Sequence, residues 1–242
     1  MAQALLPLKD LVAAKTRVSG LLTPSERRAL AQAMVEDVLA CLDGHPGIDG
    51  ITLVSDDPSA PHLAAGHRAE YLDERRLGCE GLNGVLAASL EYLPPAPDGL
   101  VVVLHGDLPA LAAQDLDRAL ALAVDADLVI GSDQAGTGTN LLVFRHERPP
   151  SFRFGANSCT RHQAWARTSG ALCKNLQTFG IGLDIDVPED LADLLHASAR
   201  GLIGTQTNRL LDTGLGARLG PVLASIESDG PSVRQQETPC DQ

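Results

Sequence analysis

Aromatic side chains are scarce in this sequence: they make up 3% of its 242 residues and include a single tryptophan. Proteins that stack nucleic-acid bases on aromatic rings need more of them, so a nucleic-acid partner is not expected. No apolar run approaches the roughly eighteen residues of a membrane-spanning helix, so no membrane partner is expected either. Walker A and Gly-x-Ser-x-Gly patterns are absent as well. The glycine-rich run from Gly214 to Gly220 comes late and has the wrong spacing, which argues against a dinucleotide dehydrogenase.

The cysteines are odd in number and show no metal-site spacing. They are Cys41, Cys79, Cys159, Cys173 and Cys240. We therefore expect reduced thiols in a cytoplasmic protein. The stretch from Met1 to Leu8 has no basic leader and runs straight into Lys9 and Asp10, which is not typical of a signal peptide.

The charge is strongly acidic, with a formal net value of -12. Such a chain repels phosphate backbones and anionic lipid, so a phosphorylated ligand must meet a local cationic patch or a divalent metal. The segment from Met1 to Arg28 is locally basic, with a net charge of +3. Small anionic ligands therefore remain open as partners. The oligomeric state is left open by the sequence, and a homodimer is one possible assembly.

The chain alternates short β-branched or leucine-rich runs with longer amphipathic stretches, which is typical of an α/β fold with a mostly parallel central sheet and helices on both faces. Predicted strands are Ala4 to Leu8, Gly50 to Ser55, Leu100 to Leu104, Leu128 to Gly131 and Asn140 to Phe144. Predicted helices are Pro24 to Leu42, Leu82 to Leu90, Ala113 to Val124 and Pro188 to Ala199. We expect a single domain over residues 1–224 and a polar, flexible tail over residues 225–242. The first half fits a fully parallel βα repeat.

Three cations follow the first predicted strand, namely Lys9, Lys15 and Arg17. In an open α/β sheet, ligands bind at the carboxyl ends of the strands, so these cations could cradle a triphosphate. The alternative is a solvated loop whose charges only keep the surface soluble.

A carboxylate, Asp107, ends the apolar strand from Leu100 to Leu104. Magnesium typically uses one or two protein carboxylates and takes its remaining ligands from water and substrate phosphates, so Asp107 is a candidate ligand. The alternative is a turn-forming aspartate before Leu108 and Pro109.

A second pair of carboxylates, Asp184 and Asp186, precedes the predicted helix at Pro188. Alternation places both side chains on one face of an extended segment, so both could point into one site. Asp186 could instead cap the helix. A cap does not explain two aspartates among apolar neighbours, where burial is costly without a metal or a cationic partner.

The segment after the fifth strand begins with an irregular, Arg- and Pro-rich stretch from Arg145 to Ser158, a length more typical of a binding loop than of a plain connection. Its glycine amides and hydroxyls, with those of the earlier run Gly136 to Asn140, could hold a carboxylate and a phosphate. The candidate residues of these segments are Thr139, Asn140, Gly155, Ser158 and His162. Without that context, the Gly-Thr run is a turn and His162 a solvated helix residue.

Taken in order along the chain, these segments resemble the 2-phospho-L-lactate guanylyltransferase group, which makes the activated phospho-acid for deazaflavin coenzyme biosynthesis. The resemblance covers about Leu5 to Ala199. It rests on the lysine-rich opening, the Leu-Thr-Pro-x-x-Arg run ending at Arg27, Leu82-Asn83, Gly106-Asp107-Leu108-Pro109, Gly138-Thr139-Asn140, Phe154-Gly155 to Ser158 with His162, and Leu183-Asp184-Ile185-Asp186 followed by Pro188-Glu189-Asp190-Leu191.

The resemblance implies a Rossmann-like nucleotidyltransferase fold, GTP as the donor, Mg²⁺ as the cofactor and a small phosphorylated acid as the acceptor. It implies that Lys15 and Arg17 hold the triphosphate, that Ser55, Asp56, Leu82 and Asn83 lie along the nucleoside, that Asp107, Asp184 and Asp186 hold the metal, and that Thr139, Gly155 and Ser158 bind the acid. Of the late pair, Asp186 is the favoured metal ligand, by its place before the helix start.

The sequence departs from that family at the acceptor side. His105 stands where members usually have a small residue or proline, and the loop reads Gly155-Ala156-Asn157-Ser158 instead of Gly-x-Gly-Ser. The family's acceptors are 2-phospholactate, phosphoenolpyruvate and 3-phosphoglycerate. Extra polar side chains could suit hydroxylated 3-phosphoglycerate, and surface drift is the alternative. A sugar-phosphate or molybdopterin nucleotidyltransferase, or a GTP-binding regulator without turnover, remain competing functions.

Overall fold

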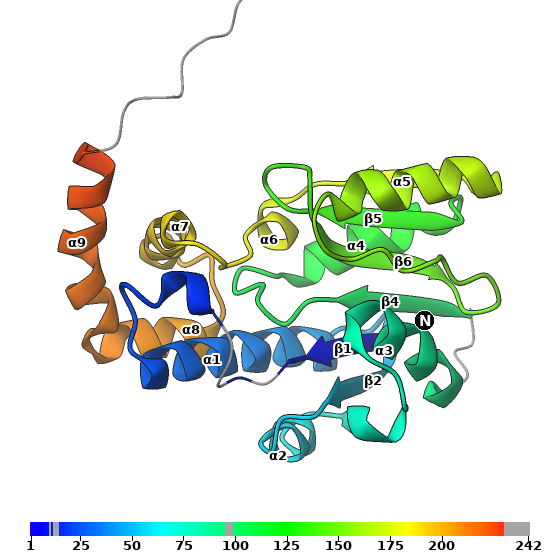
Figure 1. The fold of residues 1–242 in the computed structure, drawn as a ribbon, viewed down its shortest axis with the longest axis horizontal. Coiled ribbons are helices and arrows are strands. Elements are labelled where there is room, and N and C mark those ends of the chain that lie inside the picture. Colours follow the sequence, from blue (N-terminus) through cyan, green and yellow to red (C-terminus); the bar gives the residue numbers. More distant parts are fainter. Residues whose placement is uncertain (10, 12–14, 95–98, 230–242) are drawn as a thin grey trace, which may run out of the picture.

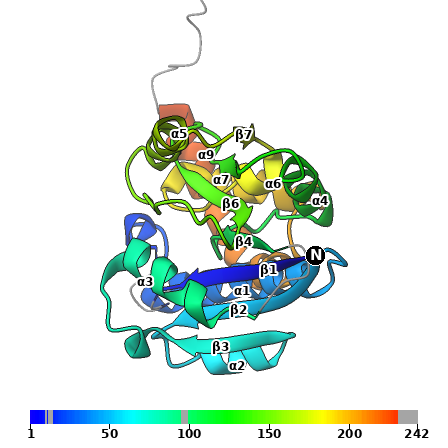
Figure 2. The same cartoon turned by 90° about the vertical axis from the view of Figure 1, so that its right-hand side faces the viewer.

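The fold is described from a computed structural model, which covers residues 1–9, 11, 15–94 and 99–229. One sheet forms its centre, with the strand order β3-β2-β1-β4-β6-β5-β7 (Figures 1 and 2). The strands are β1 (Ala2–Leu8), β2 (Ile48–Ser55), β3 (Ala69–Asp73), β4 (Leu100–Leu104), β5 (Leu128–Ser132), β6 (Thr139–Arg145) and β7 (Cys173–Leu176). Every neighbouring pair is parallel except the two that involve β6. The predicted mostly parallel α/β sheet is confirmed.

Helices cover both faces of this sheet. The α-helices are α1 (Pro24–Asp43), α2 (Ala60–Ala65), α3 (Gly81–Ser89), α4 (Ala113–Leu122), α5 (Ser158–Ser169), α6 (Phe179–Gly182), α7 (Pro188–Ala199), α8 (Thr205–Leu210) and α9 (Gly216–Asp229). Shorter helical turns are η1 (Thr16–Val18), η2 (Glu74–Arg76), η3 (Leu90–Tyr92) and η4 (Leu211–Leu215). A capping box starts α1, because Thr23 Oγ1 accepts from the Glu26 amide and Glu26 Oε2 accepts from the Thr23 amide.

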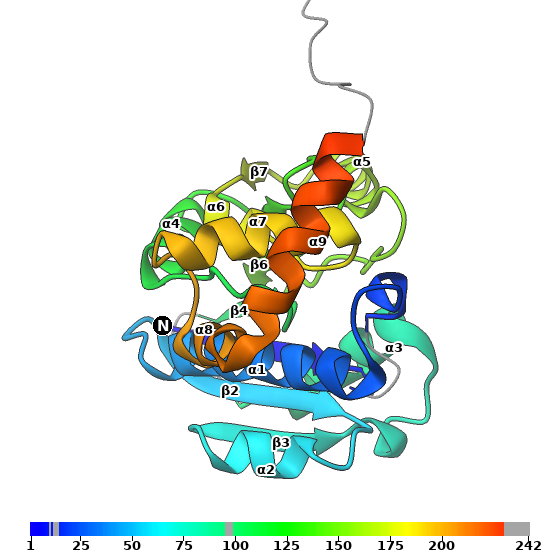
Figure 3. The same cartoon turned by 90° about the vertical axis from the view of Figure 1, so that its left-hand side faces the viewer.

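The apolar core divides into layers because successive side chains of a strand point to opposite faces. Along β1, Leu6 packs in one cluster with residues of α1, α2 and α4. Leu5 packs in the other cluster with residues of α3 and α5. A third cluster joins the outer side of α1 to α7, α8 and α9, which Figure 3 shows lying against it. The sheet is thereby buried on both faces, which agrees with its continuous apolar strands.

Several sequence-based boundaries need correction. Two edge strands, β3 and β7, and the helices α2, α5, α6, α8 and α9 were not predicted. The expected tail begins too early, because α9 continues through Asp229 and so includes residues 225–229. Residues 230–242 and Asp10 lie outside the described residues. In the part of the chain that the structure describes, no helix is long and apolar enough to cross a membrane.

Candidate active site

The candidate site forms at the edge of the sheet where β1 and β4 end. The two strands are parallel, so the loop that carries Lys15 and the turn that carries Asp107 follow at the same edge. Strand β6 is antiparallel to β4 and brings its first residues, Thr139 and Asn140, to that edge. The His105 amide donates to the Asn140 carbonyl oxygen at 3.0 Å and closes this junction. Because β6 runs in the reverse direction, it brings Thr139 and Asn140, which are predicted to bind the acid, to the same edge as Lys15, which is predicted to bind the triphosphate.

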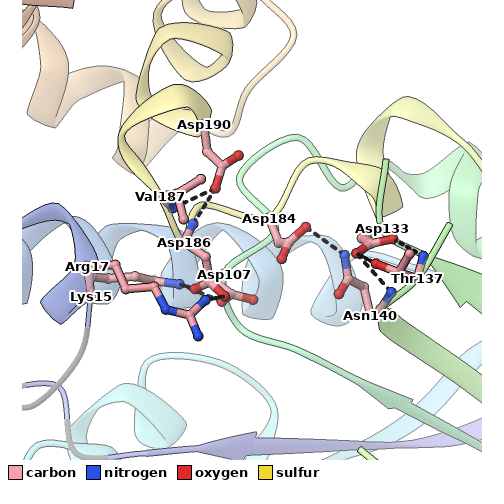
Figure 4. A network of polar contacts seen from close by, with 11 residues as sticks. Lys15, Arg17, Asp107, Asp133, Thr137, Asn140, Asp184, Asp186, Val187 and Asp190 are labelled. Atoms are coloured by element: carbon pink, nitrogen blue, oxygen red, sulfur yellow. Dashed lines mark hydrogen bonds and ion pairs between the residues drawn. The ribbon is translucent and has the colours of Figure 1, made fainter. Parts of the chain in front are cut away.

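Lys15 lies between two of the predicted metal ligands (Figure 4). Its Nζ donates to Asp107 Oδ2 at 2.6 Å and to Asp186 Oδ1 at 2.9 Å, and its side chain is only 7% exposed. Arg17, itself exposed, has Nη1 3.9 Å from Asp186 Oδ2. Burial alone would lower the pKa of the Lys15 ammonium, but the attraction of Asp107 and then Asp186 outweighs it and holds that pKa above its ordinary value. Lys15 is therefore a charged bridge between the two carboxylates.

The carboxyl of Asp107 responds to the same ion pair. Burial alone would raise its pKa, but Lys15 and then His105 lower it below the ordinary value. Asp107 is thus an anion, and its Oδ1 is buried without a hydrogen-bond partner among the described residues. A buried carboxylate oxygen without a partner is unusual and favours a cation that binds there.

Asp184 is connected to the site through Asn140. Its Oδ1 accepts from Asn140 Nδ2 at 3.1 Å, and the same Nδ2 donates to the Ile181 carbonyl oxygen at 2.9 Å. Burial, with repulsion from Asp107 and Asp186, raises the pKa of Asp184 to about 6. The side-chain amide of Asn140 therefore positions Asp184. The expected contact of Asn140 with the phosphorylated acid stays a prediction.

Asp186 is not the cap of α7. The carboxylate of Asp190 accepts instead from the Asp186 and Val187 amides, at 2.7 and 2.8 Å. This leaves the Asp186 side chain to reach Lys15 (Figure 4). The alternative explanation of Asp186 as a helix cap is therefore wrong, and the backbone turn that Asp190 holds directs Asp186 into the network.

His162 fixes the segment from Phe152 to Asn157, which we call the acceptor loop after the role predicted for Gly155. Its Nε2 accepts from the Arg153 amide at 2.9 Å, so the ring proton is on Nδ1, which faces Thr139 Oγ1 at 3.1 Å. Burial is the main cause that lowers the pKa of His162 to about 4, so the ring is neutral at pH 7. Thr139 accepts the Nδ1 proton and keeps its own hydroxyl proton to donate. The alternative of His162 as a solvated helix residue is wrong, because the residue is fully buried.

Gly155 and Ser158 stand at the start of α5. Gly155 has φ +111°, which favours glycine, and its carbonyl oxygen accepts from the Ser158 amide at 3.1 Å. Asn157 is also left-handed, at φ +55°, and precedes the first turn of the helix. The Ser158 and Cys159 amides already donate to the Gly155 and Thr137 carbonyl oxygens, so the expected contact of this turn with the acid stays a prediction.

The turn before β6 is held by Asp133, a residue that the sequence did not single out. Its carboxylate accepts from the Thr137 and Gly138 amides at 2.8 and 2.9 Å (Figure 4). A Cβ on Gly138 would come within 2.7 Å of the Asp133 carboxylate, so glycine is required there. The Gly-Thr run is thus a turn that sets the start of β6 and with it Thr139.

The side chain of Asn83, which the resemblance places along the nucleoside, contacts the backbone of Phe154. Its Oδ1 accepts from the Phe154 amide at 2.7 Å and its Nδ2 donates to the Phe154 carbonyl oxygen at 3.3 Å. Both polar atoms of its side chain therefore clamp the residue before Gly155. Leu82 is half-buried against the second core cluster. The nucleoside contact of Leu82 and Asn83 stays a prediction.

The end of β2 contributes an unpredicted anchor, Asp57. This carboxylate is 1% exposed and accepts from the Leu11 and Ser59 amides at 2.8 and 2.7 Å. It thereby ties the loop after β1 to the end of β2. Ser55 is buried, and its Oγ accepts from the Asp57 amide at 3.0 Å. The signal in the sequence was the acidic pair directly after the strand, of which Asp57, and not Asp56, turns inward.

Two other predicted nucleotide residues, Lys9 and Asp56, are exposed. Both act on the carboxyl of Glu74: burial and then Asp56 raise its pKa, and Lys9 lowers it. They therefore lie near Glu74, beside the end of the parallel strands β1 and β2. Their contact with the nucleotide stays a prediction.

The acidic cluster suits a divalent metal in its chemistry. Three carboxylates supply the oxygen ligands that Mg²⁺ prefers, and Asp107 Oδ1 lacks a partner among the described residues. Repulsion raises the pKa of Asp184, and a bound cation would relieve it. In the described ranges, however, no group of three or more His, Cys, Asp or Glu side chains is arranged to hold a metal ion, because Lys15 takes the place between Asp107 and Asp186.

Comparison with known proteins identifies the family. The family model described as guanylyl transferase CofC like matches residues 2–207. The chain belongs to this CofC-like family. A 3-phospho-D-glycerate guanylyltransferase from Phenylobacterium zucineum is 36% identical over 217 residues, which cover 87% of this chain and 95% of that protein.

Other relatives of the CofC-like chain carry different acceptor names. A phosphoenolpyruvate guanylyltransferase from Conexibacter woesei is 36% identical over 202 residues, covering 82% of this chain and 90% of that protein. A 2-phospho-L-lactate guanylyltransferase from Methanothermobacter thermautotrophicus is 33% identical over 192 residues, covering 79% and 83%. The resemblance inferred from the motifs is therefore confirmed, and the acceptor differs among relatives of similar identity.

Solved structures support the fold of the CofC-like chain. A nucleotide-diphospho-sugar transferase structure from Desulfovibrio desulfuricans has a TM-score of 0.73 at 19% identity and covers 91% of this chain and 97% of that chain. A nucleotidyl transferase from Methanothermobacter thermautotrophicus has a TM-score of 0.58 at 16% identity, covering 83% and 99%. The predicted Rossmann-like nucleotidyltransferase fold is confirmed.

Proposed function

We propose that this protein transfers GMP from GTP to the phosphate of 3-phospho-D-glycerate and releases pyrophosphate, as a step of deazaflavin coenzyme biosynthesis. The observation that carries the proposal is the network of Lys15, Asp107 and Asp186 beside the acceptor loop of a CofC-like chain. Relatives of equal identity carry both acceptor names. The lean toward 3-phosphoglycerate rests on the polar His105 and Asn157, which suit a hydroxylated acid.

The reaction is a single displacement. An oxygen of the acceptor's phosphate attacks the α-phosphorus of GTP, and the bond from that phosphorus to the oxygen bridging to the β-phosphate breaks, so pyrophosphate leaves with the electron pair. The nucleophile is already an anion, so no general base is needed. Catalysis then depends on alignment and charge neutralisation. Lys15 and Arg17, with Lys9 at the rim, supply the positive charge, and Ser55, Asp56, Leu82 and Asn83 lie on the nucleoside side.

Magnesium is the proposed cofactor, with Asp107, Asp184 and Asp186 as its ligands. When bound, it would neutralise phosphate charge and polarise the phosphoryl oxygens. Lys15 is held by the same carboxylates. This hold would weaken once a divalent cation balanced Asp107 and Asp186, which would let the Lys15 ammonium face the triphosphate. The local charge explains how a chain of net charge -12 accepts two anions.

The acid is held on the other side of the network. The Thr139 hydroxyl, whose oxygen is already paired with His162, donates its proton to the acid's carboxylate. The Gly155 amide and the Ser158 hydroxyl add further donors for the acid, since the Ser158 amide itself is taken by the Gly155 carbonyl oxygen. Asn140 acts through Asp184, which it positions.

Pyrophosphate release tests the proposal. The purified protein is incubated with Mg²⁺, each of the four nucleoside triphosphates and each of 3-phosphoglycerate, phosphoenolpyruvate and 2-phospho-L-lactate. We expect release with GTP and the highest kcat/KM for 3-phosphoglycerate. Release with GTP and a different best acid would correct the acceptor alone. GTP binding without turnover would identify a regulator. A parallel incubation uses a sugar phosphate or a molybdopterin as the acceptor, and turnover only there would place the chain among other nucleotidyltransferases.

A cytoplasmic location is part of the proposal. The four cysteines within the described residues, Cys41, Cys79, Cys159 and Cys173, are free thiols. Free thiols are the usual state of cysteines in a reducing compartment.

A further inference from the structure

His105 has a polar atom that the protein leaves unpaired. The residue directly follows β4, and its half-buried ring lies 5.2 Å from the ring of Phe154, centroid to centroid, at 35°. Its Nε2 is buried and has no hydrogen-bond partner among the residues that the structure describes. Buried polar atoms in folded proteins nearly always have a partner, so this nitrogen calls for a ligand atom.

The place of His105 indicates which part of a ligand would reach it. On one side, Asp107 and Lys15 form the end of the site where the phosphate reacts. On the other side, Phe154 leads into Gly155 and the acceptor loop. An acid that extends between these two ends passes His105 at its middle.

The three family acceptors differ at that middle position. In 3-phosphoglycerate the hydroxyl on C2 lies between the phosphate-bearing C3 and the carboxylate C1. Phosphoenolpyruvate and 2-phospho-L-lactate have no free hydroxyl there, because in both the oxygen on C2 carries the phosphate. We infer that His105 is a specificity-determining residue whose Nε2 hydrogen-bonds the C2 hydroxyl of 3-phosphoglycerate. This inference rests on the proposed function. A hydroxyl both donates and accepts, so it pairs with either tautomer of the neutral ring.

A purely structural role for His105 is the competing explanation. The Phe154 ring lies between His105 and His162, whose centroid is 5.1 Å away, so loss of the His105 ring would loosen the acceptor loop for every acid. The substitution His105→Phe keeps an aromatic ring against Phe154 and removes only the nitrogens. The substitution His105→Gln gives up the ring but restores a polar group of similar reach.

The experiment compares kcat/KM for 3-phosphoglycerate and phosphoenolpyruvate at saturating GTP. For His105→Phe we expect the ratio of the two values to fall at least tenfold in favour of phosphoenolpyruvate, with the KM for GTP within twofold of wild type, because a site built for a hydroxyl loses its discrimination when its partner is removed. His105→Gln should recover part of the ratio. His62→Phe, an exposed histidine on α2, is the control and should leave the ratio unchanged.

The outcomes separate the two claims. If His105→Phe lowers kcat/KM equally for both acids, or if His105→Gln recovers nothing of the ratio, the specificity role is refuted while guanylyl transfer stands. If wild type prefers phosphoenolpyruvate and the ratio is unchanged in His105→Phe, the inference is refuted as well. If wild type turns over neither acid, the proposed function fails first and the assignment of His105 fails with it.

Discussion

Replacing Asp184 by asparagine should stabilise the metal-free protein at neutral pH. The folded structure raises the pKa of this carboxyl from 3.8 to about 6, chiefly through burial. A pKa difference of one between the folded and unfolded states corresponds to about 1.4 kcal/mol, so the folded state carries a penalty of about 3 kcal/mol once the group is ionised. Asparagine has no charge to bury, and its oxygen can still accept from Asn140 Nδ2.

The sign of this effect fixes its pH window. Between pH 3.8 and about 6 the folded state keeps a proton on Asp184 that the unfolded chain has lost, so the free energy of unfolding falls as the pH rises through this range. Below pH 3.8 the carboxyl is neutral in both states. The difference between Asp184→Asn and wild type should therefore be near zero at low pH and reach about 2–3 kcal/mol by pH 8.

Urea unfolding of both proteins at pH 4 and pH 8 measures this difference. The single tryptophan, Trp165 on α5, packs against the second core cluster and provides the fluorescence signal. Glu70→Gln, which removes an exposed carboxylate from the edge strand β3, serves as the control and should change stability little at either pH. Equal stabilisation at both pH values, or none at pH 8, would refute the reasoning about Asp184.

The remaining predictions concern other residues of the site. His162 is neutral in the fold with a pKa of about 4, against about 6.5 when unfolded, so the free energy of unfolding should fall as the pH drops from about 6.5 to about 4; denaturant titrations of His162→Gln should lack this fall. Lys15→Met should lower the melting temperature at pH 7, because the mostly buried Asp107 and the half-exposed Asp186 lose their shared cation. Titration with Mn²⁺ alone should show tighter metal binding than in wild type, and unchanged Mn²⁺ affinity would contradict competition for those carboxylates. Asn83→Ala should raise the KM for the acid more than the KM for GTP, because the amide clamps Phe154; the reverse order in steady-state kinetics would favour the nucleoside contact.

The central strands and the main helices could be predicted from the sequence because their signals are local. The apolar run from Leu100 to Leu104 and the capping box at Thr23 each fix an element without reference to distant residues. The edge strands β3 and β7 were not predicted because they are short and each buries only one residue fully, so no continuous apolar run marks them. Helix α5 was not predicted for a similar reason, since it buries only a few of its residues.

The sequence predicted the charged residues of the site better than the hydrogen bonds of its amide side chains. Lys15 and Asp107 follow strands that end at the same edge of the sheet, and Asp186 joins them from the segment before α7. The direction of an amide side chain depends on the loop packed against it, which no local pattern describes. The contacts of Asn83 with Phe154 and of Asn140 with Asp184 were therefore not predicted. The exposed Asp56 was also selected from the sequence instead of its buried neighbour Asp57.

The reversed direction of β6 was also beyond local patterns. The run from Asn140 to Phe144 predicts a strand equally well in either direction, and only the pairing with β4 and β5 decides it. The reversal matters for the site because it places Thr139 and Asn140 beside the end of β4.

The ion pair between Lys15 and Asp186 joins residues 171 positions apart. During synthesis the lysine leaves the ribosome early, together with β1, while its second carboxylate follows only after every strand of the sheet has been made. A chain interrupted before α7 therefore carries all the strands but lacks half of the bridge that neutralises the centre. The site is thus completed only once the whole sheet and the segment before α7 have been synthesised.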